Sequence, residues 1–305
     1  MVSDFAERRR HRIGASDVAA ALTGSWGQSP ASIIAGKLGR IENPATDRMR
    51  LGLALEDSVI DAAAALLQVD VIDRQVETQH PEWPWLVATV DAVVAARGTT
   101  FPVRPLEVKT TSNPDGYPEP YLEAQLAVQC ACMGVPVGYS AVRNLATWDL
   151  KVRQHYLDDD VLEVILRMAE SLWGYLDSGV LPPAMFPADS ALWNRLHPQS
   201  TGAQVELDAA LVEELVVAKA DADQYSLIYD VVEAKVKEAL GDYEVGTVDG
   251  VPRIRWRTII SKRVDLKSLE AEAPDLVEAH RKESTARRFG VVAPIKQTHR
   301  QSKEH

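Results

Sequence analysis

Three side chains suited to phosphodiester hydrolysis lie on two short apolar segments of this 305-residue sequence. Asp91 is inside the first segment, and Glu107 and Lys109 are inside the second. Because successive side chains of a strand point to opposite faces, Glu107 and Lys109 would share a face and Val108 would turn away from it. Carboxylate oxygens suit Mg²⁺ or Mn²⁺, and a lysine beside such an ion can orient or deprotonate a water. Strands with exposed charges also show this spacing by chance, so the flanking elements have to support the interpretation.

The two segments are predicted to form one hairpin. Leu86–Ala95 and Pro105–Thr110 are apolar runs of strand length, and a glycine-containing turn at residues 97–100 separates them. Two strands joined in this way are most simply antiparallel neighbours. We therefore expect Asp91 and Glu107 on adjacent strands of one sheet.

Helices predicted before and after the hairpin each carry polar residues beside an apolar stripe. From Met49 to Leu67, apolar residues recur at helical spacing, and Glu56 lies at the edge of that stripe. It is either a solvated flank residue or a site residue. From Tyr121 to Gly134, Gln125 and Gln129 share one face of an otherwise apolar helix that a glycine ends.

A basic cluster precedes the first predicted helix. Residues 8–12 are Arg-Arg-Arg-His-Arg, and a short helix is predicted over Val18–Leu22 with Ser16 or Asp17 as its N-cap. Guanidinium groups, a hydroxyl and backbone N–H groups at a helix N-terminus suit a phosphate. The structural alternative is an ordinary capped helix after a solvated basic arm.

The composition, 46% hydrophobic and 25% charged, is that of a globular protein of one large or two smaller domains. No apolar run reaches the roughly 18 residues that span a membrane, and the first residues lack the apolar core of a signal peptide. With only Cys130 and Cys132, we expect a reducing, cytoplasmic setting without an iron–sulfur cluster or structural zinc. The net charge of −11 argues against nucleic-acid binding, but residues 8–12 and the region after residue 250 are basic.

Two domains are predicted. Up to about residue 185 the expected order is helix, helix, three strands, helix, two strands and helix, which is an α/β or α+β domain with a mixed sheet. The proline-rich stretch 181–202 is the expected boundary, so residues 1–185 form the first domain and residues 186–305 a C-terminal extension.

The extension is predicted to hold a long acidic helix, a hairpin and a basic tail over residues 281–303. The helix, Leu207–Leu240, carries an apolar seam close to heptad spacing, which suggests packing on the first domain or on another subunit. The hairpin joins Tyr243–Val248 to Arg253–Lys262 through the turn Asp249-Gly250.

Three arginines of that hairpin, Arg253, Arg255 and Arg257, are expected on one strand face. Such a row suits contact with phosphates. A solvent face paired with the acidic helix is an equally simple explanation.

Taken in order, the motifs resemble the YqaJ-like viral recombinase family, the lambda-exonuclease branch of the PD-(D/E)XK nucleases. The resemblance covers roughly residues 8–176. It rests on Arg9 with Ile13-Gly14-Ala15-Ser16-Asp17, then Gly52-x-x-x-Glu56, Asp91, Glu107-Val108-Lys109, and Tyr121-x-x-x-Gln125 with Gln129 and Met133-Gly134.

The resemblance implies a restriction-endonuclease-like core, in which helices flank a mixed β-sheet. It implies Mg²⁺-dependent digestion, with Mn²⁺ as a substitute, of one strand of linear double-stranded DNA in the 5′→3′ direction to mononucleotides. The remaining 3′ overhang would pass to a single-strand annealing protein in phage-type recombination. Members of this type can assemble as a ring-shaped trimer, and a phage or prophage origin in a bacterial cytoplasm is expected.

The resemblance also implies roles at the hydrolytic centre. Asp91 and Glu107 look like the metal-binding carboxylates, with the main-chain carbonyl of Val108 as a further ligand. Lys109 looks like the residue that activates the attacking water. Glu56 resembles an additional acidic residue that supports a second metal or its waters.

Further residues match the family's positions for the DNA. Gln125 resembles the glutamine that follows Glu-x-Lys. Arg9, Ser16 and Thr89 fall where the terminal 5′-phosphate is held, and Thr89 replaces a serine there while keeping the hydroxyl. The neighbouring arginines, Arg8, Arg10 and Arg12, are alternatives to Arg9. The frequent Pro-Asp pair is Val90-Asp91 here, a departure that matters little because the proline is not a ligand. The second glutamine often found two residues after the first is Ala127 here, so the resemblance gives Gln129 little support as a functional residue.

Other functions stay open at this point. A repair or restriction endonuclease could share the fold, and a non-catalytic DNA-binding protein could be built on a decayed nuclease. The presence of Asp91, Glu107 and Lys109 speaks against decay. A structural coiled-coil protein would explain Leu207–Leu240 and nothing before it.

Overall fold

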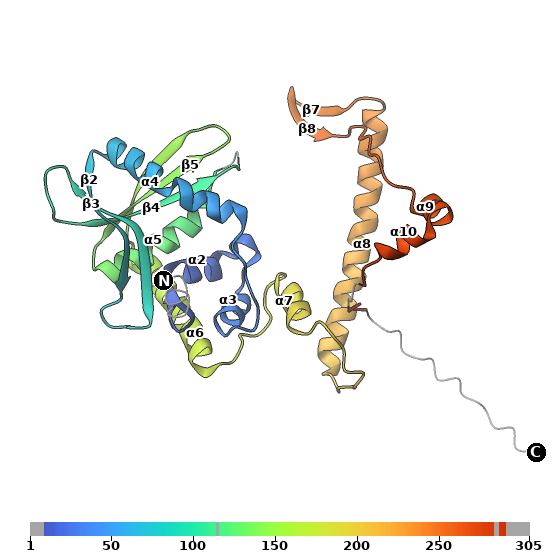
Figure 1. Cartoon of the computed structure of the whole chain (residues 1–305), viewed down its shortest axis with the longest axis horizontal. Coiled ribbons are helices and arrows are strands. Elements are labelled where there is room, and N and C mark those ends of the chain that lie inside the picture. Colours follow the sequence, from blue (N-terminus) through green and yellow to red (C-terminus); the bar gives the residue numbers. More distant parts are fainter. Residues whose placement is uncertain (1–8, 114–115, 284–286, 291–305) are drawn as a thin grey trace, which may run out of the picture. The chain divides into compact units, whose positions relative to one another are not determined.

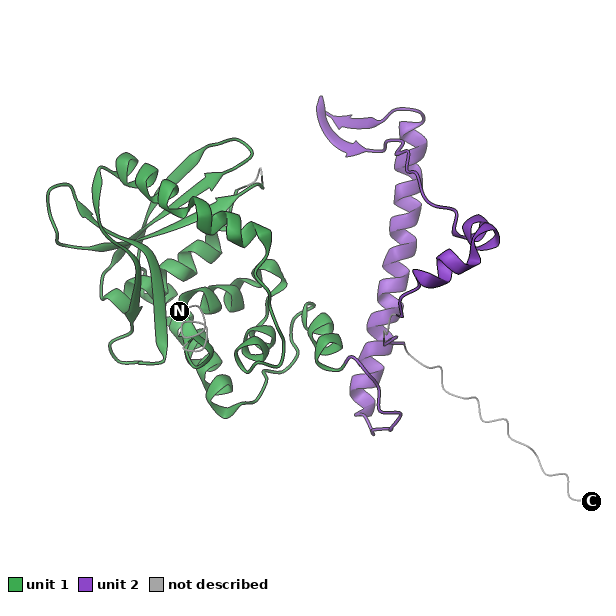
Figure 2. Cartoon of the chain, viewed as in Figure 1, with its two compact units in different colours: residues 1–197 green, residues 198–305 purple. Residues whose placement is uncertain are grey.

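A computed structural model describes residues 9–113, 116–283 and 287–290 of the chain. The chain divides into two compact units, residues 1–197 and 198–305 (Figure 2). Arg8 and most of the predicted basic tail lie outside the described residues. Each unit is described by itself below.

The first unit is built on a six-stranded mixed sheet (Figure 1). The predicted hairpin is present, because β3 (Leu86–Ala96) and β4 (Arg104–Thr111) pair antiparallel with Ala92 opposite Leu106. β4 then pairs parallel with β5 (Val137–Asn144), which pairs antiparallel with β6 (Leu150–Tyr156). β2 (Val69–Gln79) pairs antiparallel along nearly all of β3. The parallel pair makes the sheet mixed, as the sequence predicted.

The edge of β3 opposite β2 is shared by two strands. A two-residue strand, β1 (Ile13–Gly14), runs parallel to the start of β3, and β4 pairs with Ala92, Val93 and Val94. Between them, residues 88–91 pair with no strand on this edge within the described part of the chain. This gap lies beside Asp91 and lets side chains from other elements reach the backbone of β3.

Helices cover both faces of the sheet, and two apolar clusters mark the core. One cluster joins α4 (Asp47–Leu67) to the centre of the sheet through Val59, Ile60, Leu106 and Val108. The other cluster joins α2 (Ala15–Thr23), α3 (Pro30–Lys37), α5 (Glu119–Met133) and α6 (Asp159–Ser178) to the start of β3. No helix within the described residues is long and apolar enough to cross a membrane.

The start of α2 differs from the prediction. Its N-cap is Gly14 rather than Ser16 or Asp17, and the Gly14 N–H donates to Asp17 Oδ2 at 2.7 Å. The helix begins earlier because Asp17 caps from the third helical position. As a result, Ser16 lies in the first turn, where backbone N–H groups have no helical partner.

The first unit extends past the boundary predicted at residue 185. A short helix, α7 (Asp189–Leu196), packs Leu192 against Ala31 and Ala35 of α3. The buried Asp189 carboxylate accepts hydrogen bonds from the Ser29 hydroxyl and from the N–H groups of Met185 and Phe186. These contacts tie the segment to the first unit, so the division falls after His197.

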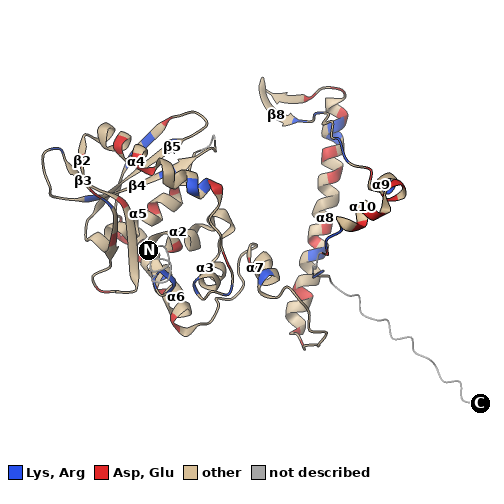
Figure 3. Cartoon of the chain, in the orientation of Figure 1, with Lys and Arg blue, Asp and Glu red and all other residues tan. Residues whose placement is uncertain are grey.

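The second unit contains α8 (Ala209–Leu240), the hairpin of β7 (Val245–Val248) and β8 (Val251–Arg255), α9 (Leu266–Glu272) and α10 (Pro274–Ala279). The predicted turn is present, with positive φ at Asp249 and Gly250. The predicted second strand is too long, because β8 ends at Arg255 and Arg257 lies outside it. Figure 3 shows acidic residues along the length of α8. Most of the apolar side chains of this helix are exposed.

Candidate active site

The hairpin brings Asp91, Glu107 and Lys109 together on one side of the sheet. Val108 packs on the opposite side against α4, as strand alternation predicted. The two strands are locked at this point, since Asp91 Oδ2 accepts the Val108 N–H at 2.8 Å. The antiparallel register therefore places both carboxylates and the amine next to one another.

Glu107 is the fully buried member, with 0% of its surface exposed. Its Oε1 accepts hydrogen bonds from Gln125 Nε2 at 2.6 Å and from the Lys109 ammonium. Its Oε2 accepts a hydrogen bond from Gln129 Nε2 at 2.5 Å. A buried carboxylate needs such donors, because an unpaired one costs several kcal/mol, on the order of 3–5 kcal/mol. Both glutamines of α5 thus have a partner in the site.

Gln129 is the site residue that the sequence did not assign. Its side chain is fully buried, and its Nε2 also donates to the Thr89 carbonyl at 3.2 Å, across the gap in the β3 edge. The amide oxygens of Gln125 and Gln129 have no hydrogen-bond partner among the described residues. Two amides one turn apart on an apolar helix were the available signal, but only the fold shows that both face Glu107.

Asp91 is partly buried at the wall of the cavity. Burial, and then the neighbouring Glu107 carboxylate, raise its pKa well above the ordinary 3.8, and Lys109 and the Val108 N–H oppose the rise. Two carboxylates this close strongly favour a cation between them.

Lys109 carries its positive charge in this arrangement. Burial alone would lower its pKa, but Glu107 and Asp91 hold the pKa above the usual range for lysine. The Lys109 ammonium can therefore donate hydrogen bonds but has no lone pair with which to take a proton.

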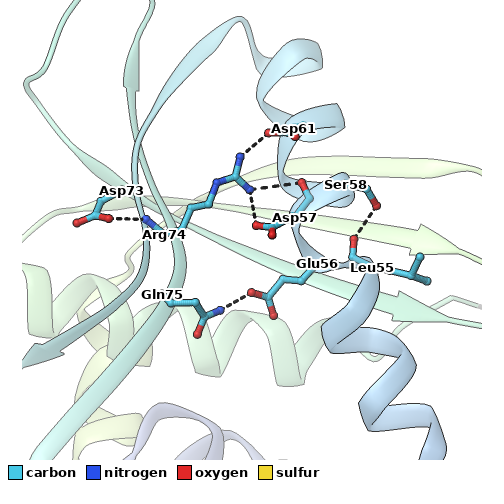
Figure 4. Close-up of polar contacts among 8 residues, drawn as sticks. All are labelled: Leu55, Glu56, Asp57, Ser58, Asp61, Asp73, Arg74 and Gln75. Atoms are coloured by element: carbon cyan, nitrogen blue, oxygen red, sulfur yellow. Dashed lines mark hydrogen bonds and ion pairs between the residues drawn. The ribbon is translucent and has the colours of Figure 1, made fainter. Parts of the chain in front are cut away.

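Glu56 reaches the site from α4. Figure 4 shows it directed at Gln75 of β2, whose amide donates to Glu56 Oε1. Burial raises the pKa of Glu56, while the Gln75 hydrogen bond and Lys109 lower it.

The neighbouring residue of β2 ties this strand to α4. Arg74 Nη1 donates to Asp57 at 2.8 Å, and Arg74 also contacts Asp61. Gln75 has a left-handed φ of 51° within β2, a strained conformation that is found at functional sites.

One cavity of about 260 Å³ joins the cluster of Asp91, Glu107 and Lys109 to the N-terminal segment. The two ends have different chemistry: carboxylates and Lys109 line one end, and basic and hydroxyl groups line the other. Its lining includes Arg9, Arg12, Gly14, Ser16, Glu56, Gln75, Glu77, Thr89, Asp91, Glu107, Lys109 and Gln125.

The basic end of the cavity is built by β1 and the first turn of α2. Arg9 Nη2 donates to the Ser16 hydroxyl at 3.2 Å. Thr89 lies across from them on β3, which β1 adjoins. Arg12 also lines the cavity, but it pairs with Glu77 at 3.1 Å. A guanidinium, two hydroxyls and a helix N-terminus suit a terminal phosphate.

The oxygen donors at the other end fit a hard divalent cation. Asp91 and Glu107 would hold it with the carbonyl of Val108, and Glu56 lines the same cavity. In the described residues, no three Asp, Glu, His or Cys side chains are close enough to share one ion as they stand. Lys109 and the two glutamines engage Glu107 in this arrangement, and Gln75 engages Glu56.

The structure does not place the remaining predicted DNA contacts in this cavity. Arg253, Arg255 and Arg257 belong to the second unit, where all three are exposed. Arg10 is exposed and does not line the cavity.

The first part of the chain is similar to a known protein family. Residues 4–133 match the model of the YqaJ-like viral recombinase domain, which confirms the resemblance found from the motifs. A protein of Bacillus subtilis (strain 168), the uncharacterized protein YqaJ, is 24% identical over 93% of this chain and 92% of its own length.

Two solved structures are also similar to the chain. The alkaline exonuclease LHK-Exo from Laribacter hongkongensis is 18% identical, with a TM-score of 0.47 over 58% of this chain and 93% of its own. A phage-related exonuclease from Haemophilus somnus 129PT is 9% identical, with a TM-score of 0.43 over 55% of this chain and 94% of its own.

We predict that Asp91→Asn stabilises the metal-free protein at neutral pH. Because the pKa of Asp91 is raised on folding, its ionisation favours the unfolded state as pH climbs above the ordinary 3.8. The variant should unfold about 2–4 °C higher than wild type at pH 7. The difference should shrink as pH falls through 3.8 toward about 3, where wild-type Asp91 is mostly protonated in both states. A constant difference across this range, measured by thermal unfolding in a chelator, would contradict the account.

We further predict that Gln129→Leu weakens binding of Mn²⁺ by about 10- to 100-fold, as loss of groups that orient metal ligands does. The change removes the donor to Glu107 Oε2 and puts an apolar side chain of similar size in its place. Titration calorimetry measures the affinity, and Gln154→Leu, at an exposed glutamine of β6, is the control. Equal Mn²⁺ affinity in wild type and Gln129→Leu would show that Gln129 only fills space.

Proposed function

Residues 4–133 match the model of the YqaJ-like viral recombinase domain, and from this premise we propose that the chain is a metal-dependent 5′→3′ exodeoxyribonuclease. Its substrate is linear double-stranded DNA, of which it digests one strand to mononucleotides. The observation that carries the proposal is the single cavity in which Asp91, Glu107 and Lys109 adjoin Arg9, Ser16 and Thr89. The first group suits hydrolysis of a phosphodiester, and the second suits recognition of a phosphorylated strand end.

Mg²⁺ is the proposed cofactor, with Mn²⁺ as a substitute. Asp91, Glu107 and the carbonyl of Val108 would hold it, and Glu56 would support a second ion or its waters. When bound, such an ion withdraws charge from the scissile phosphate and makes a neighbouring water more acidic.

The side chains around the ion have distinct tasks in this proposal. Lys109 donates hydrogen bonds to the attacking water or to a phosphate oxygen, consistent with its ammonium form. Gln125 and Gln129 orient Glu107 through its two oxygens.

The other end of the cavity would select the strand end. Arg9, Ser16 and Thr89 would hold the terminal 5′-phosphate, together with N–H groups at the start of α2. Such contacts position the strand without reading its sequence. Because β3 carries both Thr89 and Asp91, the phosphate and the scissile bond would be held in one register.

We extend the proposal to the partners. A single-strand annealing protein would receive the 3′ overhang, and a ring-shaped homo-oligomer would keep the enzyme on DNA. Arg253, Arg255 and Arg257 of the second unit would add phosphate contacts that weaken with salt.

The proposal is tested by digestion of three substrates in Mg²⁺: linear duplexes with a 5′-phosphate or a 5′-hydroxyl, and a closed circle. We expect the phosphorylated duplex to be shortened fastest and the circle to remain intact.

Lys109→Ala should lower kcat by about 10²–10³, as loss of a charged donor at a reacting centre does. Arg9→Ala should raise KM for the phosphorylated end alone.

Arg167→Ala is the matched control, because Arg167 is an exposed arginine of α6 outside the cavity. Equal cleavage of the closed circle would support an endonuclease of the same fold instead. Full activity in Lys109→Ala would overturn the assignment of the hydrolytic centre.

A further inference from the structure

Trp26 is a solvent-exposed aromatic residue in a backbone conformation that L-residues seldom adopt. Trp26 is 54% exposed, and its φ is 56°. It lies in the short 3₁₀ helix η1 (Ser25–Gly27), directly after α2. Strained residues of this kind persist where the surroundings hold them and often serve a function.

The loop around Trp26 is closed by backbone hydrogen bonds. The Gly24 N–H donates to the Ala20 carbonyl at 2.9 Å, and the Gly27 N–H donates to the Gly24 carbonyl at 3.2 Å. Both glycines have positive φ, which this tight turn requires. The loop therefore presents the indole in a fixed position rather than on a loose tether.

The indole is supported by two tyrosines. Trp26 packs on Tyr121 with ring centroids 4.5 Å apart and planes at 83°, and on Tyr117 at 5.6 Å. The tyrosine rings are 6.0 Å apart. These are favourable edge and tilted geometries for aromatic pairs. Tyr121 is buried, so the cluster supports the indole from inside while Trp26 stays exposed.

This aromatic cluster adjoins the hydrolytic centre. Tyr121 lies one helical turn before Gln125, which donates to Glu107. Burial raises the pKa of Tyr121 to about 12, and the nearby Lys109 ammonium opposes the rise. Burial also raises the pKa of Tyr117, and the Lys109 ammonium opposes that rise as well. Through Tyr121 and α5, the exposed ring of Trp26 is therefore connected to the groups around Glu107.

Resting on the proposed function, we propose that Trp26 is a stacking platform for one nucleobase of the bound DNA. The cavity supplies charged groups for phosphates, but among the described residues no aromatic side chain lines it on which a base could stack. Every base has an aromatic face, so stacking on an indole holds a nucleotide whatever its sequence. That property suits an enzyme that must process any sequence one nucleotide at a time.

The test compares Trp26→Ala and Trp26→Phe with wild type. Trp148→Ala is the matched control, since Trp148 is 71% exposed, also has positive φ, and lies in the turn between β5 and β6 of the same unit. Binding of 5′-phosphorylated duplexes is measured by fluorescence anisotropy in a chelator. A series of duplexes carries one abasic nucleotide at successive positions from the end.

Loss of one stacked base corresponds to about 5- to 150-fold in affinity. We expect Trp26→Ala to lose affinity within this range, Trp26→Phe to lose less, and Trp148→Ala to bind like wild type. An abasic nucleotide at one position should lower the affinity of wild type for the duplex by a similar factor. At that position it should leave the affinity of Trp26→Ala unchanged. KM should rise in Trp26→Ala more than kcat falls.

The inference is overturned if Trp26→Ala binds intact duplex like wild type. It is also overturned if, at every position of the abasic nucleotide, the abasic duplex lowers the affinity of Trp26→Ala by the same factor as it lowers the affinity of wild type. In either case, wild-type digestion of linear duplex leaves the proposed function standing. If wild type neither binds nor digests linear duplex, the proposed function fails, and this inference fails with it.

Discussion

The burial of the Glu107 carboxylate is the constraint on which the rest of the site depends. A buried, unpaired carboxylate would destabilise the fold by several kcal/mol, on the order of 3–5 kcal/mol, so donors have to converge on it. Lys109 comes from the same strand, and Gln125 and Gln129 come from α5. This requirement explains two amides on an otherwise apolar helix face. It also fixes how α5 lies over the sheet, and with it the position of Tyr121 and the aromatic cluster.

The divided edge of β3 connects the two ends of the cavity. β1 pairs with the start of the strand and β4 with its second half, and Gln129 donates to the Thr89 carbonyl between them. Thr89 and Asp91 are therefore two residues apart on one rigid strand. In the proposed nuclease, this spacing links the capture of a strand end to the cleavage of its phosphodiester. Gln129 contacts both Glu107 and the Thr89 carbonyl of β3, so it links the two ends of the cavity.

The parts of the fold that depend on local pattern were predictable from the sequence, and the parts that depend on tertiary contacts were not. Strand alternation and a glycine turn predicted the hairpin that carries Asp91 and Glu107, and helical spacing predicted the helices around Glu56 and Gln125. A two-residue strand such as β1 is too short to show a pattern. The place of α7 depends on the Ser29–Asp189 contact between distant segments. Alternation continued past Arg255, but the paired register ends there opposite Val245, the first residue of β7, and one further backbone hydrogen bond joins the Trp256 N–H to the Glu244 carbonyl.

The central claim is that Asp91 and Glu107 hold a divalent ion at this hairpin. Anomalous X-ray scattering from crystals soaked in Mn²⁺ tests it most directly, because the signal locates the ion without reference to activity. The account predicts a peak within about 2 Å of carboxylate oxygens of both residues and of the Val108 carbonyl oxygen. A peak elsewhere in the first unit, with none at the hairpin at saturating Mn²⁺, would contradict it.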